Sequence, residues 1–141
     1  MTDRAGATVG PEPRSEVHGL PFSTTSNRRA RDLLAAFLRD SPLAAHVAQD
    51  AAIVIGELVA NGVDHGRPDG HSGLEVSWQL DSTGLRLSVL DGGGGTSAPH
   101  VVAASAYAAR GRGLAMVQAL STAWWVDTDP GTRVTAVLAL G

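Results

Sequence analysis

Three polar side chains that could take part in binding or catalysis interrupt one apolar segment at helical spacing. Glu57 lies inside the run of residues 53–60, where an ionised carboxylate is costly unless it is paired or bound to something. Asn61 and His65 follow at intervals of one helical turn, so the three side chains share one edge of the predicted helix. They offer a base, an amide oxygen able to bind a hard cation, and an imidazole. Alternatively, they form the solvent-exposed edge of a helix that has only a structural role.

Two glycine-containing segments can likewise be interpreted as ligand-binding or as purely structural. Asp91 directly follows a predicted strand and precedes four glycines, residues 92–95. An acid at a strand end can accept a hydrogen bond from a ligand amine, and glycines let a flat ligand approach the backbone. Residues 111–114 precede a predicted helix, whose N-terminal N–H groups and dipole favour a phosphate. Taken singly, these segments are also typical of a flexible loop and of a loop-to-helix junction.

A further cluster around one turn contains only metal-ligating residue types. Its members are Asp64, His65, Asp69 and His71. Their spacing matches no standard ligand motif for a transition metal, and the surrounding sequence is typical of a solvated loop. We therefore predict no transition-metal site there.

Composition excludes several classes of function. The chain has 141 residues, enough for one domain, and its 43% hydrophobic and 18% charged residues are typical of a globular protein. The net charge of −3 argues against binding nucleic acid or an anionic membrane through bulk charge. Cysteine and lysine are both absent, which excludes disulfides, thiolate metal sites, the Walker phosphate loop and Schiff-base chemistry. Without a signal-like N-terminus or a membrane-length apolar run, we expect a cytoplasmic protein.

The first half of the chain predicts a strand and two helices. Residues 1–15 are expected to form a disordered arm, and residues 16–141 the domain. Residues 16–22 resemble a strand, and a helix should begin at one of the possible capping residues 23–26. A second helix should begin at Ser41 and Pro42 and end near Asp64. The apolar face of the first helix is predicted to contain Ala30, Leu33, Leu34, Phe37 and Leu38.

The second half predicts mostly strands. Alternation over residues 74–80 and 85–89, with a turn at 81–84, indicates a hairpin. A helix should start near residues 111–113, a strand near Trp124, and a last strand should cover residues 134–140 after a turn at 129–131. These elements predict an α+β fold, a two-layer sandwich with helices on one face of a mostly antiparallel sheet.

In this order and spacing, the polar segments resemble the boxes of the Bergerat-fold (GHKL) ATP-binding superfamily. Residues 57–65 are similar to its N box, residues 91–95 to the DxGxG box and residues 111–114 to the GxGL box. Gly131 and Thr132, before the last strand, also fit. The resemblance covers roughly residues 16–141 and is strongest to the stand-alone bacterial anti-sigma-factor serine/threonine kinases. It implies the Bergerat fold with ATP and Mg²⁺ as cofactors.

The resemblance assigns a role to each box. Asn61 would bind Mg²⁺, Glu57 would be the general base on a protein hydroxyl or a water, and Asp91 would accept the adenine amino group. Residues 96–110 would form a mobile lid, with Arg110 or Arg112 near the phosphates. Glycines would make room for the adenine ring and expose N–H groups to phosphate, and Thr132 would touch adenine through water. The nucleotide-binding set implied in this way is Asn61, His65, Asp91, Gly93, Gly95, Arg110, Gly111, Arg112, Gly113, Leu114 and Thr132.

Two residues depart from the pattern of the resembled kinases. Asp64 stands where a basic residue is frequent, and Gly62 stands where alanine is usual. Both put the rate of catalysis in question more than ATP binding. The implied function is a Mg-ATP-dependent protein kinase that phosphorylates a STAS-type antagonist, sequesters a sigma factor, or both, with homodimerisation possible. The alternatives are an ATP-binding partner-switch module without significant phosphotransfer, and an interaction domain that binds no nucleotide.

Overall fold

The computed structural model describes residues 13–41, 43–65, 73–92, 101–102, 114–128 and 131–141. The helices and strands in chain order are β1 (Arg14–Pro21), α1 (Ser26–Leu38), α2 (Ala45–His65), β2 (Gly73–Asp81), β3 (Gly84–Asp91), β4 (Val101–Val102), α4 (Ala115–Leu120), β5 (Ala123–Asp127) and β6 (Thr132–Leu138). None of the helices in these ranges is long and apolar enough to cross a membrane.

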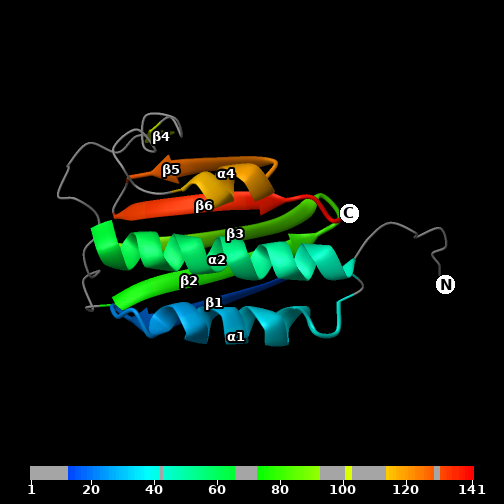
Figure 1. Cartoon of the computed structure of the whole chain (residues 1–141), viewed down its shortest axis with the longest axis horizontal. Helices are drawn as coiled ribbons and strands as arrows, with labels where there is room; N and C mark the ends of the chain where they lie inside the picture. The colour runs from blue at the N-terminus through cyan, green and yellow to red at the C-terminus, as the bar shows by residue number, and fades with distance from the viewer. Residues whose placement is uncertain (1–12, 42, 66–72, 93–100, 103–113, 129–130) are drawn as a thin grey trace.

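The strands form one six-stranded sheet in the order β1-β2-β3-β6-β5-β4. Every neighbouring pair in it is antiparallel. The three described helices lie together on one face of this sheet (Figure 1). This confirms the predicted α+β sandwich of two layers.

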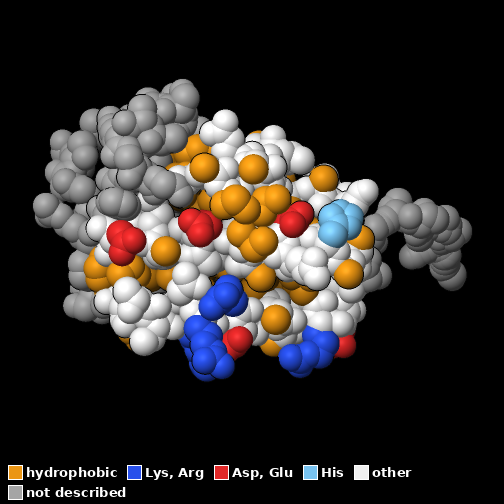
Figure 2. All heavy atoms as spheres, viewed as in Figure 1, with side chains coloured by type: hydrophobic (Ala, Val, Ile, Leu, Met, Phe, Trp, Pro, Cys, Tyr) orange, Lys and Arg blue, Asp and Glu red, His pale blue; other side chains and the backbone are white. Residues whose placement is uncertain are grey.

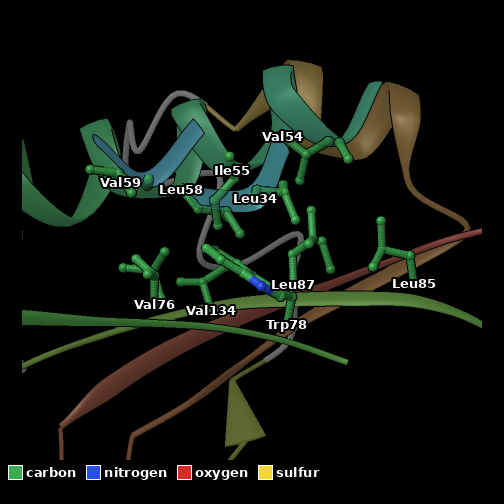
Figure 3. Packing of buried hydrophobic residues seen from close by; sticks show 14 of the residues in the cluster. Leu34, Val54, Ile55, Leu58, Val59, Val76, Trp78, Leu85, Leu87 and Val134 are labelled. Atoms are coloured by element: carbon green, nitrogen blue, oxygen red, sulfur yellow. The ribbon is translucent and has the colours of Figure 1, made fainter. Parts of the chain in front are cut away.

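The core lies between the two layers because both contribute regular apolar faces. Along β2 and β3, side chains on one face of the sheet are buried, as the alternation of residue types predicted. Trp78, only 2% exposed, is the largest of them. Figure 3 shows side chains of the sheet pointing toward those of the helices, namely Val76, Trp78, Leu85, Leu87 and Val134 toward Leu34, Val54, Ile55, Leu58 and Val59.

The predicted apolar face of α1 is confirmed. Ala30, Leu34, Phe37 and Leu38 are buried, and Leu33 is partly buried against them. The N-cap position is Thr25, whose side chain makes no cap hydrogen bond. The hydroxyl of Ser26 instead donates to the Pro21 carbonyl, 2.6 Å away, and so connects the start of α1 to the end of β1.

The hairpin between β2 and β3 is also confirmed, with Asp81 paired to Gly84. The Asp81 carboxylate accepts hydrogen bonds from the backbone N–H of Thr83 at 2.8 Å and from its hydroxyl at 2.5 Å. These two bonds hold the pKa of Asp81 below its usual value. A short acidic side chain therefore closes the turn, as is common for Asp at this position.

Several predicted boundaries are wrong, and one of them is the last strand, because β6 covers Thr132–Leu138 rather than residues 134–140. β1 begins at Arg14 rather than residue 16, so the predicted arm ended two residues too late; Arg14 and Ser15 pair with Leu80 and Gln79, a tertiary contact. Helix α2 begins at Ala45 rather than Pro42, because the N–H of Leu43 donates to the Ser41 carbonyl at 2.8 Å instead of opening a helix. Residues 1–12 lie outside the described residues.

Glu16 should make the stability of this sheet edge sensitive to acid. Its carboxylate accepts hydrogen bonds from His18 at 2.9 Å and from the indole N–H of Trp78 at 3.1 Å. The bond from His18, more than any other contact, lowers the pKa of Glu16 below 4.5. This stabilisation is therefore complete above about pH 4.5 and is lost as the pH falls through the lowered folded-state pKa.

We expect Glu16→Gln to reduce the free energy of unfolding at pH 7 by no more than about 1 kcal/mol, because the side chain is 41% exposed and solvent screens its charge. The difference between variant and wild type should shrink below pH 4. Urea unfolding at pH 7 and pH 3.5 measures both quantities. If the difference in unfolding free energy between variant and wild type is the same at pH 7 and pH 3.5, the charge of Glu16 does not stabilise the sheet edge.

Candidate functional site

The polar stripe of α2 divides between the interior and the surface. Asn61 is 5% exposed and continues the buried face of the helix, whereas Glu57 is half-buried. Because an α-helix turns about 100° per residue, the two side chains are about 40° apart around the axis and one turn apart along it. His65 is the last residue of α2, and its side chain is outside the described part of the structure. The exposed Asp64 places its carboxylate in water.

Hydrophobic packing holds this helix in place. Val54, Ile55 and Leu58 are at most 1% exposed and anchor α2 on the sheet. Asn61 lies one turn after Leu58 and is itself buried, so the same packing covers its amide. An amide in such a position is costly unless its polar atoms find partners. The same packing therefore keeps the amide of Asn61 away from bulk water.

Asp91 lies on the sheet, opposite the part of α2 that contains Asn61 and Gly62. It is the last residue of β3, is 4% exposed and pairs in register with Thr132 of β6. A Cβ atom built on Gly62 of α2 would lie 3.8 Å from Oδ2 of Asp91, so this carboxylate points toward the residue after Asn61. The structure therefore brings together Asn61, Asp91 and Thr132, three predicted site residues from distant parts of the sequence.

The backbone at Gly131 passes directly over the end of β3. A Cβ atom at this position would lie 2.0 Å from the carbonyl oxygen of Asp91 and 3.3 Å from the side chain of Leu90. No side chain fits at such a distance, so a glycine is required. The close approach lets β6 begin at Thr132 beside Asp91, which explains why the sequence has glycine immediately before Thr132.

Gly131→Ala should therefore damage both the fold and the site. We expect it to lower the free energy of unfolding by about 1–3 kcal/mol, as overpacking of a tight interior does, and to weaken ATP binding because Asp91 must move. Gly19→Ala on β1 is the matched control, since a Cβ there meets nothing within 4 Å, and it should stay within about 0.5 kcal/mol. Urea unfolding and calorimetry with ATP measure the two effects. Equal stability of the two variants would contradict the close approach.

A contact that sequence analysis missed holds α1 to α2 beside the site. The amide of Asn27 donates a hydrogen bond of 2.9 Å to the carbonyl oxygen of Gly56, the residue before Glu57. A Cβ at Gly56 would lie 3.2 Å from Oδ1 of Asn27, so glycine permits this approach of the helices. The available signal was Gly56 itself, because a glycine inside a helix is destabilising unless packing requires it.

The other predicted nucleotide contacts are only partly described. Gly93, Gly95, Arg110, Gly111, Arg112 and Gly113 lie outside the described residues. Leu114 precedes α4 and is buried in the core, so its side chain serves packing. Helix α4 begins at Ala115, slightly later than predicted.

The segment predicted as a lid contains one described element. Val101 and Val102 form the short strand β4, which pairs with Val126 and Asp127 of β5; the prediction did not include it. The remaining lid residues, 96–100 and 103–110, lie outside the described residues, so the lid stays a prediction.

Within the described ranges, no group of three or more His, Asp or Glu side chains is placed to hold a metal ion. Asp69 and His71 are outside those ranges. Mg²⁺ at Asn61 remains a prediction.

Fold and site together define an α+β domain in which the buried carboxylate at the end of β3 points toward the part of α2 that contains the buried amide of Asn61. The sequence model of the histidine kinase-like ATPase domain matches residues 20–138. The chain therefore belongs to the histidine kinase-like ATPase domain family, which confirms the resemblance to the superfamily and makes ATP the expected ligand.

The solved structures that are similar to this chain include one that matches over most of its length. It is the crystal structure of the RsbU and RsbW domains of Rv1364c from Mycobacterium tuberculosis, with a TM-score of 0.69 and 24% sequence identity. The match covers 90% of this chain and 32% of that one, so this chain spans about a third of its length. At this identity the likeness supports the fold alone. The comparison with curated proteins found no match.

Proposed function

We propose that this chain binds Mg-ATP and transfers the γ-phosphoryl group to a serine or threonine hydroxyl of a STAS-type protein, and that it binds a sigma factor in exchange. The observation that carries the proposal is that Asp91 pairs with Thr132 and points toward Gly62, the residue after Asn61, in a chain of the histidine kinase-like ATPase family. The stand-alone anti-sigma-factor kinases, which the sequence resembles, carry the same boxes in the same order.

The buried side chains fit a Mg-ATP ligand. The amide oxygen of Asn61 is a hard donor of the kind that Mg²⁺ accepts, and the carboxylate of Asp91 is an acceptor suited to the adenine amino group. Thr132 pairs in register with Asp91, which supports its proposed water-mediated contact with the same ring. When bound, Mg²⁺ would offset the negative charge of the phosphates.

Glu57 is suited to act on the protein substrate. Its carboxylate is half-buried and, within the described part of the chain, makes no hydrogen bond or ion pair, so it is available to accept a proton. In the proposed transfer, the substrate oxygen forms a bond to the γ-phosphorus while its proton passes to Glu57. The bond between the γ-phosphorus and the bridging oxygen breaks, and its electron pair leaves with ADP. The exposed Asp64 faces water, so its charge need not oppose the phosphates.

Incubation with γ-labelled ATP and Mg²⁺, in the presence of STAS-domain proteins and sigma factors of the same genome, tests the proposal. Label on a STAS protein supports the kinase. ATP binding with nucleotide-dependent partner binding but no label would favour the partner-switch module instead. Absence of ATP binding in calorimetry would contradict both functions.

A further inference from the structure

The helix layer exposes apolar side chains close to Glu57. Among the described residues, the large hydrophobic side chains that are well exposed are Val17 (62%), Ile53 (41%) and Met116 (44%). Val17 lies on β1, whereas Ile53 and Met116 lie on α2 and α4, two helices that pack against each other. Figure 2 shows hydrophobic side chains gathered over these two helices, with acidic side chains beside them.

Ile53 and Glu57 are neighbours on the surface of α2. They are four residues apart, which corresponds to about 6 Å along the helix axis. Asp50 lies three residues before Ile53, and at 100° per residue the three side chains fall within an arc of about 60°. Glu57 is therefore the end of a continuous strip that contains an acid, an exposed apolar side chain and the proposed base.

A protein substrate must contact this strip in order to bring its hydroxyl group to Glu57. A general base acts only within about 3 Å of the proton that it accepts. A hydroxyl on a folded protein reaches that distance only if the surrounding surface of the protein rests on the neighbours of Glu57. Those neighbours include Ile53, whose exposed apolar surface gains free energy when a partner removes it from water.

We infer that Asp50, Ile53 and Met116 form the docking surface for the protein substrate of the proposed kinase; this inference rests on the proposed function. The partner is a protein that carries an apolar side chain close to its acceptor serine or threonine, so that the apolar side chain packs on Ile53 while the hydroxyl reaches Glu57. A basic residue of the partner faces Asp50. The apolar contact supplies affinity, and the charge pair supplies orientation.

Ile53→Asp tests the surface, and Val17→Asp is the matched control because Val17 is more exposed and lies on β1. The probe is the STAS-domain protein that accepts phosphate from the wild-type chain. For Ile53→Asp we expect kcat/KM toward this protein to fall at least about tenfold, mainly through a higher KM, as loss of a central interface contact does. The ATP dissociation constant should stay within twofold, and Val17→Asp should change neither quantity by more than twofold.

Two further variants keep the test independent of one substitution. Met116→Asp on α4 and Asp50→Arg should also raise KM for the protein substrate without changing ATP affinity. Equal kinetics of wild type, Ile53→Asp and Asp50→Arg would overturn the docking surface while leaving the kinase intact. Absence of transfer by the wild type would instead overturn the proposed function. If Ile53→Asp weakens the binding of a sigma factor but leaves the kinetics toward the STAS substrate unchanged, the partner assigned to this surface is wrong.

Discussion

Replacement of Glu57 by alanine should reduce phosphoryl transfer to the protein substrate by about 10²–10⁴-fold, the usual loss when a general base is removed. The ATP dissociation constant should change only a few-fold, because Glu57 lies on the outer flank of α2 while the proposed nucleotide contacts Asn61 and Asp91 are buried. Glu57→Gln keeps the shape of the side chain and should show the same loss. Single-turnover transfer of labelled phosphate and calorimetry with Mg-ATP measure the two quantities.

Asp32→Asn is the control for this experiment, because Asp32 is an exposed acid on α1. Its transfer rate should equal that of the wild type. A Glu57→Ala variant that still forms the nucleotide-dependent complex but transfers little phosphate would separate binding from chemistry. Unchanged transfer in Glu57→Ala would show that another group accepts the proton.

Asn61→Ala should abolish most Mg-ATP binding. Loss of even an outer-shell partner of a bound metal costs about 10–100-fold in affinity, so loss of the proposed direct ligand should cost at least about 100-fold. The effect should depend on the metal: in buffer with EDTA, wild type and variant should bind ATP with similarly low affinity. Calorimetry with and without Mg²⁺ measures both conditions.

Gln49→Ala is the matched control, since Gln49 carries an exposed amide on the same helix. It should bind Mg-ATP like the wild type. Thermal unfolding should accompany the measurements, because Asn61 is buried and its truncation leaves a small cavity. A folded Asn61→Ala variant with wild-type affinity for Mg-ATP would refute the assignment of the metal ligand.

Several features of the fold could be predicted because they depend on local periodicity. The apolar residues of α1 recur at helical spacing, and the side chains of β2 and β3 alternate, so both elements follow from which faces must leave water. The hairpin turn followed from Asp81 and Gly84, whose chemistry is local. The predicted boundaries were wrong where contacts with distant residues determine them. Arg14, for example, pairs with Leu80 of another strand.

The sequence by itself identified the family, because the boxes have characteristic residue types in a characteristic order, and the same boxes supplied the proposed site residues. The tertiary structure alone decided how these residues meet. Strand β6 lies between β3 and β5, and nothing local in the sequence encodes this partner. Only that pairing places Thr132 beside Asp91 and brings Gly131 over its carbonyl oxygen.

The tertiary structure also separated two side chains that the sequence placed on one edge. Asn61 is buried and Glu57 is half-exposed, although they are one turn apart. The reason is physical: the side of α2 that contains Val54 and Leu58 packs on the sheet, and a rotation of about 40° is enough to carry a side chain from that contact to the surface. Spacing along a helix predicts which residues are neighbours, but the surface that covers the helix determines which of them a ligand and a partner can reach.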